Sequence, residues 1–174
     1  MNLLETMLSR RSIRQYSREA IPEEKLNRIL QAGLLAPSSR NLKPCQFYVI
    51  HDRETLMDLA RAKAMGAAML KNCDTAIAVL SDSEKADTWI EDSSIALSFM
   101  MLMAQEQEIG SCWCQIHLRR SAEGKDAEET VRSILGIGGS MRIVGILALG
   151  IPEKSAPAHS LDELSWDKVH YVYP

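Results

Sequence analysis

Three arginines stand within five positions in the stretch RRSIR, as Arg10, Arg11 and Arg14. The chain as a whole is acidic, with 20 Lys and Arg against 23 Asp and Glu. Like charges this close together repel one another unless water or an anion compensates them. A guanidinium group donates paired, charge-assisted hydrogen bonds to phosphate, which makes an anion site one interpretation of the stretch. A solvated basic patch is the other, and RRSIR alone leaves both open.

A second candidate is the loop APSSRNLKP at residues 36–44. It offers two hydroxyls, an amide and backbone N–H groups between an expected helix and an expected strand. Loops at the edge of a sheet commonly bind ligands. The alternative is a loop that only caps the helix.

A third candidate is GSCWCQ at residues 110–115, where Gly110 permits close approach of another backbone. Successive residues of a strand alternate faces, so Cys112 and Cys114 should lie opposite Trp113 and Gln115. Core packing explains the cysteines. Gln115 needs a partner, because an unsatisfied buried amide costs about 1–3 kcal/mol.

Side-chain patterns for other chemistries are missing from the sequence. The motifs HExxH, GxSxG and GxxxxGK do not occur. The histidines are scattered along the chain: His51, His117, His159 and His170. The cysteines lack the CxxC spacing of zinc or redox sites, which favours reduced, buried thiols at Cys45, Cys73, Cys112 and Cys114. An enzyme of this kind can take its chemistry from a cofactor.

Composition describes an ordinary globular protein, with 46% apolar and 25% charged residues in 174. That length suits a single domain over residues 1–174. The net charge of −3 argues against general nucleic-acid binding. No apolar run approaches the ~20 residues of a membrane span, and the charges of MNLLETMLSRRS follow its apolar residues, unlike a signal peptide. We therefore expect a soluble, cytoplasmic protein.

Hydrophobic periodicity predicts the elements that position these candidates. Helices are expected at residues 2–9, from Pro22 to a stop at Pro37, at 53–72 with a break near Gly66, at 91–109 and at 127–135. Strands are expected at residues 45–50, 75–80, 111–118 and 142–150.

Several of these elements carry more specific expectations. The first helix should bury Leu3, Leu4, Met7 and Leu8, and the second Leu26, Ile29, Leu30 and Leu34. The helix at 91–109 is apolar almost all round and should be buried on several sides, with Gly110 as its left-handed cap. The segment 45–50 should be a buried strand.

The C-terminal segment, residues 151–174, differs from the rest of the chain. Proline, serine and charged residues dominate it until KVHYVY at 168–173, which alternates like an edge strand. We expect an arm that ends in a strand. Trp166, Val169, Tyr171 and Tyr173 would be buried if the arm crossed to a second subunit, whereas the alternative is an arm that folds back on its own subunit.

Four stretches in this order resemble the nitroreductase family of flavin enzymes: RRSIRQY, APSSRNLKPCQFYVI, the acidic-led helix running into IGSCW, and RIVGILALGIP. The resemblance covers about residues 1–152. It implies FMN at the interface of a homodimer, electrons from NADH or NADPH, and nitroaromatics, quinones or similar acceptors. It also implies an α+β sandwich with a central mixed sheet between helices and arms exchanged between subunits. Alternating helices and strands alone would suggest a parallel sheet.

The same resemblance implies three groups of FMN-binding residues. The phosphate would be held by Arg10, Arg11, Ser12 and Arg14, which favours the anion site over the basic patch. The ring and ribityl chain would be contacted from the other subunit by Pro37, Ser38, Ser39 and Asn41. The ring near its N5 edge would be lined by Trp113, Cys114 and Gln115. The chemistry would take place on the flavin, with no catalytic side chain.

The chain departs from the family's pattern at several positions. Lys43 stands where glutamine is usual, and Cys45 where tryptophan often follows the proline. Arg40 takes a position that often carries a small polar residue, and we expect Arg40 and Lys43 to face the substrate. The family usually supplies a further basic residue from the C-terminal arm to the phosphate. This chain offers only Lys154 or His159.

The leading hypothesis is an FMN-dependent NAD(P)H oxidoreductase that works by a ping-pong mechanism. One alternative is a specialised flavin enzyme, such as a dehalogenase- or flavin-destructase-like protein, although these usually carry extra lid segments. The other is a flavin-binding or redox-sensing protein with little turnover.

Overall fold

Two central strands, β2 (Thr75–Asp82) and β4 (Met141–Gly150), organise the fold of residues 2–173, which the computed structural model describes. They pair with each other and with the edge strands β1 (Cys45–Ile50) and β3 (Gly110–Gln115) in the order β1-β2-β4-β3. All three strand pairs are antiparallel. The parallel pairing in the described chain is a single bridge between Ser12 and Ser111, beside β3.

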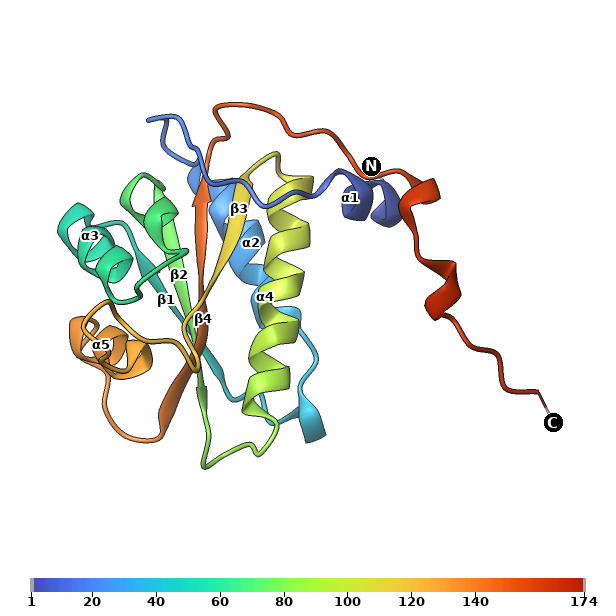
Figure 1. Cartoon of the computed structure of the whole chain (residues 1–174). Coiled ribbons are helices and arrows are strands. Elements are labelled where there is room, and N and C mark those ends of the chain that lie inside the picture. The colour runs from blue at the N-terminus through green and yellow to red at the C-terminus, as the bar shows by residue number, and fades with distance from the viewer. Residues whose placement is uncertain (1, 174) are drawn as a thin grey trace.

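Helices cover both faces of the sheet (Figure 1). On one face lie α2 (Glu23–Leu35) and α4 (Trp89–Glu106), which pack against Ile77, Val79 and Leu147. On the other lie α3 (Arg53–Arg61), the short η2 (Ala68–Lys71) and α5 (Ala127–Ile134). The remaining helix, α1 (Leu3–Ser9), lies outside these layers against the end of α4. The α+β sandwich is confirmed, and the parallel sheet suggested by alternating elements is wrong.

The predicted break in the segment 53–72 is confirmed, because α3 ends at Arg61 and Gly66 has φ of +76° before η2 begins. The left-handed cap predicted at Gly110 is wrong. Glu108 takes the positive φ of +60°, and Gly110 opens β3. Glycine is needed at 110 because a Cβ there would lie 2.9 Å from Ile13 Cγ2 and 3.1 Å from the Gly150 carbonyl. Close backbone approach at Gly110 is therefore confirmed.

Apolar side chains that were expected to be buried are exposed in the single chain. They occur on α1, at the end of α2, on one side of α4 and on β1: Leu3, Leu4, Met7, Leu34, Ile95, Phe99, Tyr48 and Val49. The strand β1 is thus an exposed edge rather than a buried strand. Exposed apolar side chains on several elements are a candidate interaction surface.

The C-terminal arm leaves the domain past α1 and extends away from it (Figure 1). Backbone hydrogen bonds from Glu153 to Gln15 and from His159 to Leu8 hold its first part. Beyond them the arm carries two short turns, η3 (Leu161–Glu163) and η4 (Trp166–Lys168). The strand predicted at 168–173 does not form within one chain, and Val172 is 95% exposed.

A buried carboxylate joins α5 to the sheet. Glu128, 5% exposed, accepts hydrogen bonds from Arg142 Nε and Nη2 at 2.5 and 2.9 Å and from Ile143 N–H at 3.0 Å. The His117 Nδ1 atom lies 3.2 Å from the same group. Burial alone would raise the pKa of Glu128, but these hydrogen bonds outweigh burial and hold the pKa below its usual value.

We expect Glu128→Gln to lower the free energy of unfolding at pH 7 by about 1–3 kcal/mol, since it removes the charge that accepts hydrogen bonds from the partly exposed Arg142. A lowered carboxyl pKa stabilises the fold above the ordinary glutamate value and loses that effect as pH falls through the folded value. The difference in the free energy of unfolding between wild type and variant should therefore become smaller below about pH 4.3. Urea unfolding across pH measures it, with exposed Glu129→Gln as the matched control. A difference that stays constant with pH would contradict this role.

Candidate functional site

The RRSIR segment runs along the start of β3, at the edge of the sheet. The Ile13 N–H donates to the Ser111 carbonyl at 2.9 Å, and Ser12 is bridged to Ser111. Burial raises the pKa of the Cys112 thiol, while the nearby Arg14 and Arg10 act in the opposite direction. The Ser12 hydroxyl lies beside the same thiol. The structure thus brings Arg10, Ser12 and Arg14 together around the start of β3.

One hydrogen-bond donor of the Arg10 side chain has no acceptor in the described chain. Its Nη1 atom is buried and has no partner within residues 2–173. Arg14 Nη1 makes only a long contact, 3.3 Å, to the Ser12 carbonyl. A buried donor left without an acceptor is costly, and an anionic oxygen is the strongest acceptor for a guanidinium group. These residues therefore fit a phosphate group.

Lys63 is a residue of this region that the sequence analysis did not identify. It follows α3, is half-buried and lies close enough to Cys112 and Cys114 to oppose the effect of burial on both pKa values. We call Arg10, Arg14 and Lys63 the basic cluster. The signal available in the sequence was a lysine beside the predicted helix break near Gly66.

Arg11 faces a different partner. Its Nη1 atom donates to the Pro157 carbonyl, so this side chain ties the arm to α1. His159 lies on the same stretch of arm, with Nδ1 2.8 Å from Glu163 Oε2, and Lys154 is exposed. In the single chain, Arg11 and His159 engage the arm rather than the basic cluster, and a phosphate contact from Arg11, Lys154 or His159 stays a prediction.

The alternation predicted for β3 is confirmed. Cys112 and Cys114 are buried on the α3 side, whereas Trp113 packs on the α4 side. Burial raises the pKa of the Cys114 thiol to about 11. The thiol is therefore uncharged at neutral pH, as suits a residue in the core. Any contact from Cys114 to a ligand would come from its backbone. All four cysteines are free thiols, as expected, but Cys45 is half-buried whereas Cys73, Cys112 and Cys114 are buried.

Gln115 finds the partners that its amide needs. Trp113 Nε1 donates to Gln115 Oε1 at 3.0 Å, and Gln115 Nε2 donates to the His117 carbonyl at 3.2 Å. The Trp113 ring lies over Gly145, where a Cβ would come within 2.5 Å of Nε1. These contacts fix the orientation of Trp113 and Gln115 at the end of β3.

The loop at residues 36–44 is strained. The backbone φ angles are +52° at Arg40, +54° at Asn41 and +46° at Lys43. Residues other than glycine rarely adopt this left-handed region. Such strain persists where surrounding contacts enforce it and is concentrated at functional sites. The short η1 (Ser39–Asn41) lies inside this loop.

The buried carboxylate of Asp92 anchors the loop to the first turn of α4. Its Oδ1 accepts from Ser39 N–H at 2.9 Å, and its Oδ2 accepts from Thr88 Oγ1 at 3.2 Å. Within the loop, Lys43 N–H donates to Ser38 Oγ at 2.8 Å. The hydroxyl of Ser38 and the backbone of Ser39 are thereby held in place. This order favours a ligand-binding loop over a loop that only caps the helix.

The two candidate regions lie at opposite ends of α4. The loop is tied to Asp92, whereas α1, which leads into RRSIR, is tied by Thr6 Oγ1 to Glu106 Oε2 at 2.8 Å. At 1.5 Å per helical residue, Asp92 and Glu106 are about 21 Å apart along the axis. One chain therefore does not bring the loop and the basic cluster together.

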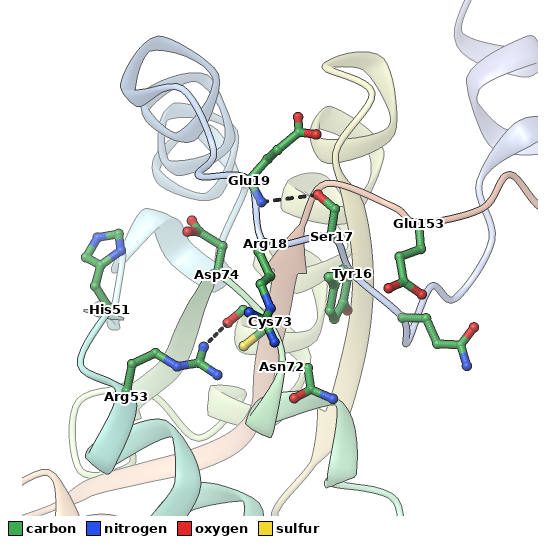
Figure 2. A pocket seen from close by; sticks show the side chains of 11 residues that line it. Tyr16, Ser17, Arg18, Glu19, His51, Arg53, Asn72, Cys73, Asp74 and Glu153 are labelled. Carbon is green, nitrogen blue, oxygen red and sulfur yellow. Dashed lines mark hydrogen bonds between the residues drawn. The ribbon is translucent and has the colours of Figure 1, made fainter.

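A cavity of about 750 Å³ lies elsewhere, between the segment after RRSIR, the start of α3 and the arm (Figure 2). None of the residues predicted for the site lines it. Both positively and negatively charged side chains line this cavity. Arg53 already donates to the Cys73 carbonyl, and Asp74 already accepts a hydrogen bond from the Thr75 hydroxyl. Figure 2 shows Glu19 and Glu153 at its rim.

Within residues 2–173, no group of three or more His, Cys, Asp or Glu side chains is arranged to hold a metal ion. None of the helices described is both long and apolar enough for a membrane span.

The sequence model of the nitroreductase family matches residues 7–68 and 56–151. The chain belongs to the nitroreductase family. An Archaeoglobus fulgidus protein with the provisional name NADH dehydrogenase/NAD(P)H nitroreductase is 33% identical over 96% of this chain and 95% of its own. A solved FMN-dependent nitroreductase from Clostridium difficile is 37% identical, with a TM-score of 0.94 over 97% of this chain and 98% of that one.

A second solved structure, of a Parabacteroides distasonis protein with the same provisional name as the archaeal one, is 28% identical. It has a TM-score of 0.89 over 98% of each chain. The nitroreductase fold therefore extends over nearly the whole chain, including the start of the arm.

Proposed function

We propose that this nitroreductase-family enzyme is an FMN-dependent oxidoreductase that moves electrons from NADH or NADPH to nitroaromatics, quinones or similar acceptors. The observation that carries the proposal is the buried, unpartnered Nη1 of Arg10 beside Arg14 and Lys63. The similar Clostridium difficile structure, named as FMN-dependent, supports the same cofactor.

In this proposal the basic cluster and Ser12 hold the FMN phosphate through charge-assisted hydrogen bonds. The end of β3, where Trp113 and Gln115 are fixed in orientation, would line the ring and help to exclude water from it. Bound FMN supplies the hydride chemistry, which no side chain of the protein can provide. The chain's own part is to bind, orient and leave one face of the ring open.

We further propose that the site is completed by a second copy of the chain in a homodimer. The exposed apolar residues on α1, α2, α4 and β1 supply an interface. In the dimer, Pro37, Ser38, Ser39 and Asn41 of one subunit would approach the basic cluster of the other. Within one chain, α4 keeps the loop and the basic cluster about 21 Å apart. In the dimer, the loop of one subunit and the cluster of the other would form one site.

The exposed edge of β1 suits the exchanged arm. Within residues 2–173 it has no ladder partner on its outer side, whereas β3 is bridged to Ser12. Residues 168–173 could add a strand there and bury Tyr171 and Tyr173, which are 69% and 77% exposed in the single chain.

The function is tested by steady-state oxidation of NADH or NADPH with a quinone acceptor. With one flavin and one open face, donor and acceptor take turns at the same place, so double-reciprocal lines should be parallel. Convergent lines would mean that both substrates bind together. Stoichiometric bound FMN without turnover for any acceptor would identify a flavin-binding protein instead.

The phosphate assignment is tested by Arg14→Ala. We expect its affinity for FMN to fall by about 1.5–3 kcal/mol, the range for hydrogen bonds to charged groups. Riboflavin lacks the phosphate and should bind wild type weakly and the variant almost as well. Flavin fluorescence titration measures both, with Arg28→Ala, from an exposed pair with Glu24, as the control. Equal losses for the two flavins would refute the assignment.

The exchanged arm is tested by a chain stopped at Pro152. Without the arm, the dimer should dissociate or weaken, because the apolar residues of the arm gain roughly 1.5–3 kcal/mol each when fully buried. Light scattering gives the mass and absorbance gives the flavin content, while circular dichroism checks the fold. A truncated protein that remains a dimer with full flavin content would rule out the exchange.

A further inference from the structure

The strained loop presents two cations on the outside of the site. Arg40 and Lys43 both adopt positive φ, and both side chains belong to exposed residues. Asparagine or glycine occupies such backbone conformations more easily, so cations are an unfavourable choice for a loop that only caps a helix. An observed strain of this kind points to a function for the residues that bear it.

Arg40 has a partner that is easily replaced. Its Nη2 atom lies 2.7 Å from Asp87 Oδ1, and the two side chains are 65% and 80% exposed. Ion pairs this exposed contribute little, because water and salt compete with them. An anionic ligand can therefore take the place of Asp87 at low cost.

Lys43 is one of the residues that line a small hollow of about 160 Å³ between the loop, the end of α2, the start of β1 and α4. The walls are mainly apolar, with Leu34, Pro37, Pro44 and Phe47 among them. The Lys43 ammonium group has no partner in residues 2–173. A hollow with apolar walls and one cation among its lining residues suits a ring that carries a negative substituent.

The acidic groups nearby do not cancel this preference. Asp92 also lines the hollow, but it is 3% exposed and both of its oxygens accept hydrogen bonds from the loop and α4. Asp87 is exposed, and within residues 2–173 its side chain binds only Arg40. Asp87 is thus the carboxylate that an incoming anion displaces.

We propose that Arg40 and Lys43 select acceptors in which a carboxylate, sulfonate or phosphate is attached to the reducible aromatic or quinone ring. This rests on the proposed function, because it names the substrate class for the same site. The charged substituent binds the two cations and takes no part in electron transfer. Asp87 holds Arg40 in place until such an acceptor arrives.

The test compares matched acceptors with the FMN-loaded enzyme: 1,4-naphthoquinone against its 2-sulfonate, and nitrobenzene against 4-nitrobenzoate. The ratio of kcat/KM, anionic over neutral, should exceed one at low salt and fall as salt rises. Arg40→Gln and Lys43→Gln should each lower the ratio by about tenfold, and Asp87→Asn should raise it by about threefold. Arg61→Gln, from the exposed Asp58 pair on α3, is the control and should leave it unchanged.

A second measurement does not depend on turnover. Calorimetric titration should show that benzoate binds more tightly than its neutral analogue benzamide, and that Arg40→Gln removes the difference. Persistent preference for benzoate without turnover of any acceptor would disprove the proposed function and leave the anion site standing.

Three results would overturn the inference. In the first, Arg40→Gln and Lys43→Gln leave the acceptor ratio unchanged. In the second, both classes of acceptor lose activity equally, which would mean that the loop has only a structural role. In the third, the variants change the KM for NADPH relative to NADH and leave the acceptors unaffected, which would assign the cations to the donor's phosphate.

Discussion

The length and rigidity of α4 determine how far apart the candidate binding regions lie within one chain. The helix fixes the strained loop at its first turn through Asp92 and the α1 segment at its last turn through Glu106. Because a helix is rigid over this length, the two candidate regions cannot approach each other within one chain. We therefore propose that a site needing both is built from two chains, with the exposed Ile95 and Phe99 of α4 as part of the contact between them.

Electrostatics complement this geometry. In an acidic chain, Arg10, Arg14 and Lys63 are gathered at the start of β3 around neutral thiols, and one buried donor of Arg10 has no acceptor in the described chain. A cluster of this kind is unfavourable until an anion binds. In the single chain, Arg11 donates to the Pro157 carbonyl of the arm, whereas the buried donor of Arg10 is left for a ligand.

Local patterns in the sequence were sufficient for most elements of the fold. Periodicity located the helices and strands, and the alternation of Cys112, Trp113 and Cys114 was confirmed because strand geometry leaves no other arrangement. Strand direction could not be obtained in this way. The antiparallel order depends on long-range pairing, and the family resemblance, rather than residue patterns, gave the α+β sandwich.

The remaining errors concern features that local sequence patterns do not determine. Leu34, Met7 and the residues of β1 have the pattern of buried positions, yet one chain leaves them exposed, and periodicity does not distinguish burial in a core from burial against a partner. Lys63 was missed because its place near Cys114 depends on the turn after α3, where the Cys114 thiol donates to the Gly66 carbonyl. RRSIR and the loop were found as candidates, but only coordinates place them at opposite ends of α4.

Complementation between two defective chains tests the shared site most directly. One chain would carry Arg10→Ala and Arg14→Ala, and the other Ser38→Ala, Ser39→Ala and Asn41→Ala, so that neither binds FMN alone. Refolded together, they should recover about a quarter of the wild-type flavin, since random pairing makes half the dimers mixed, each with one intact site. A mixture that binds no more flavin than its separate components would contradict a site built from two chains.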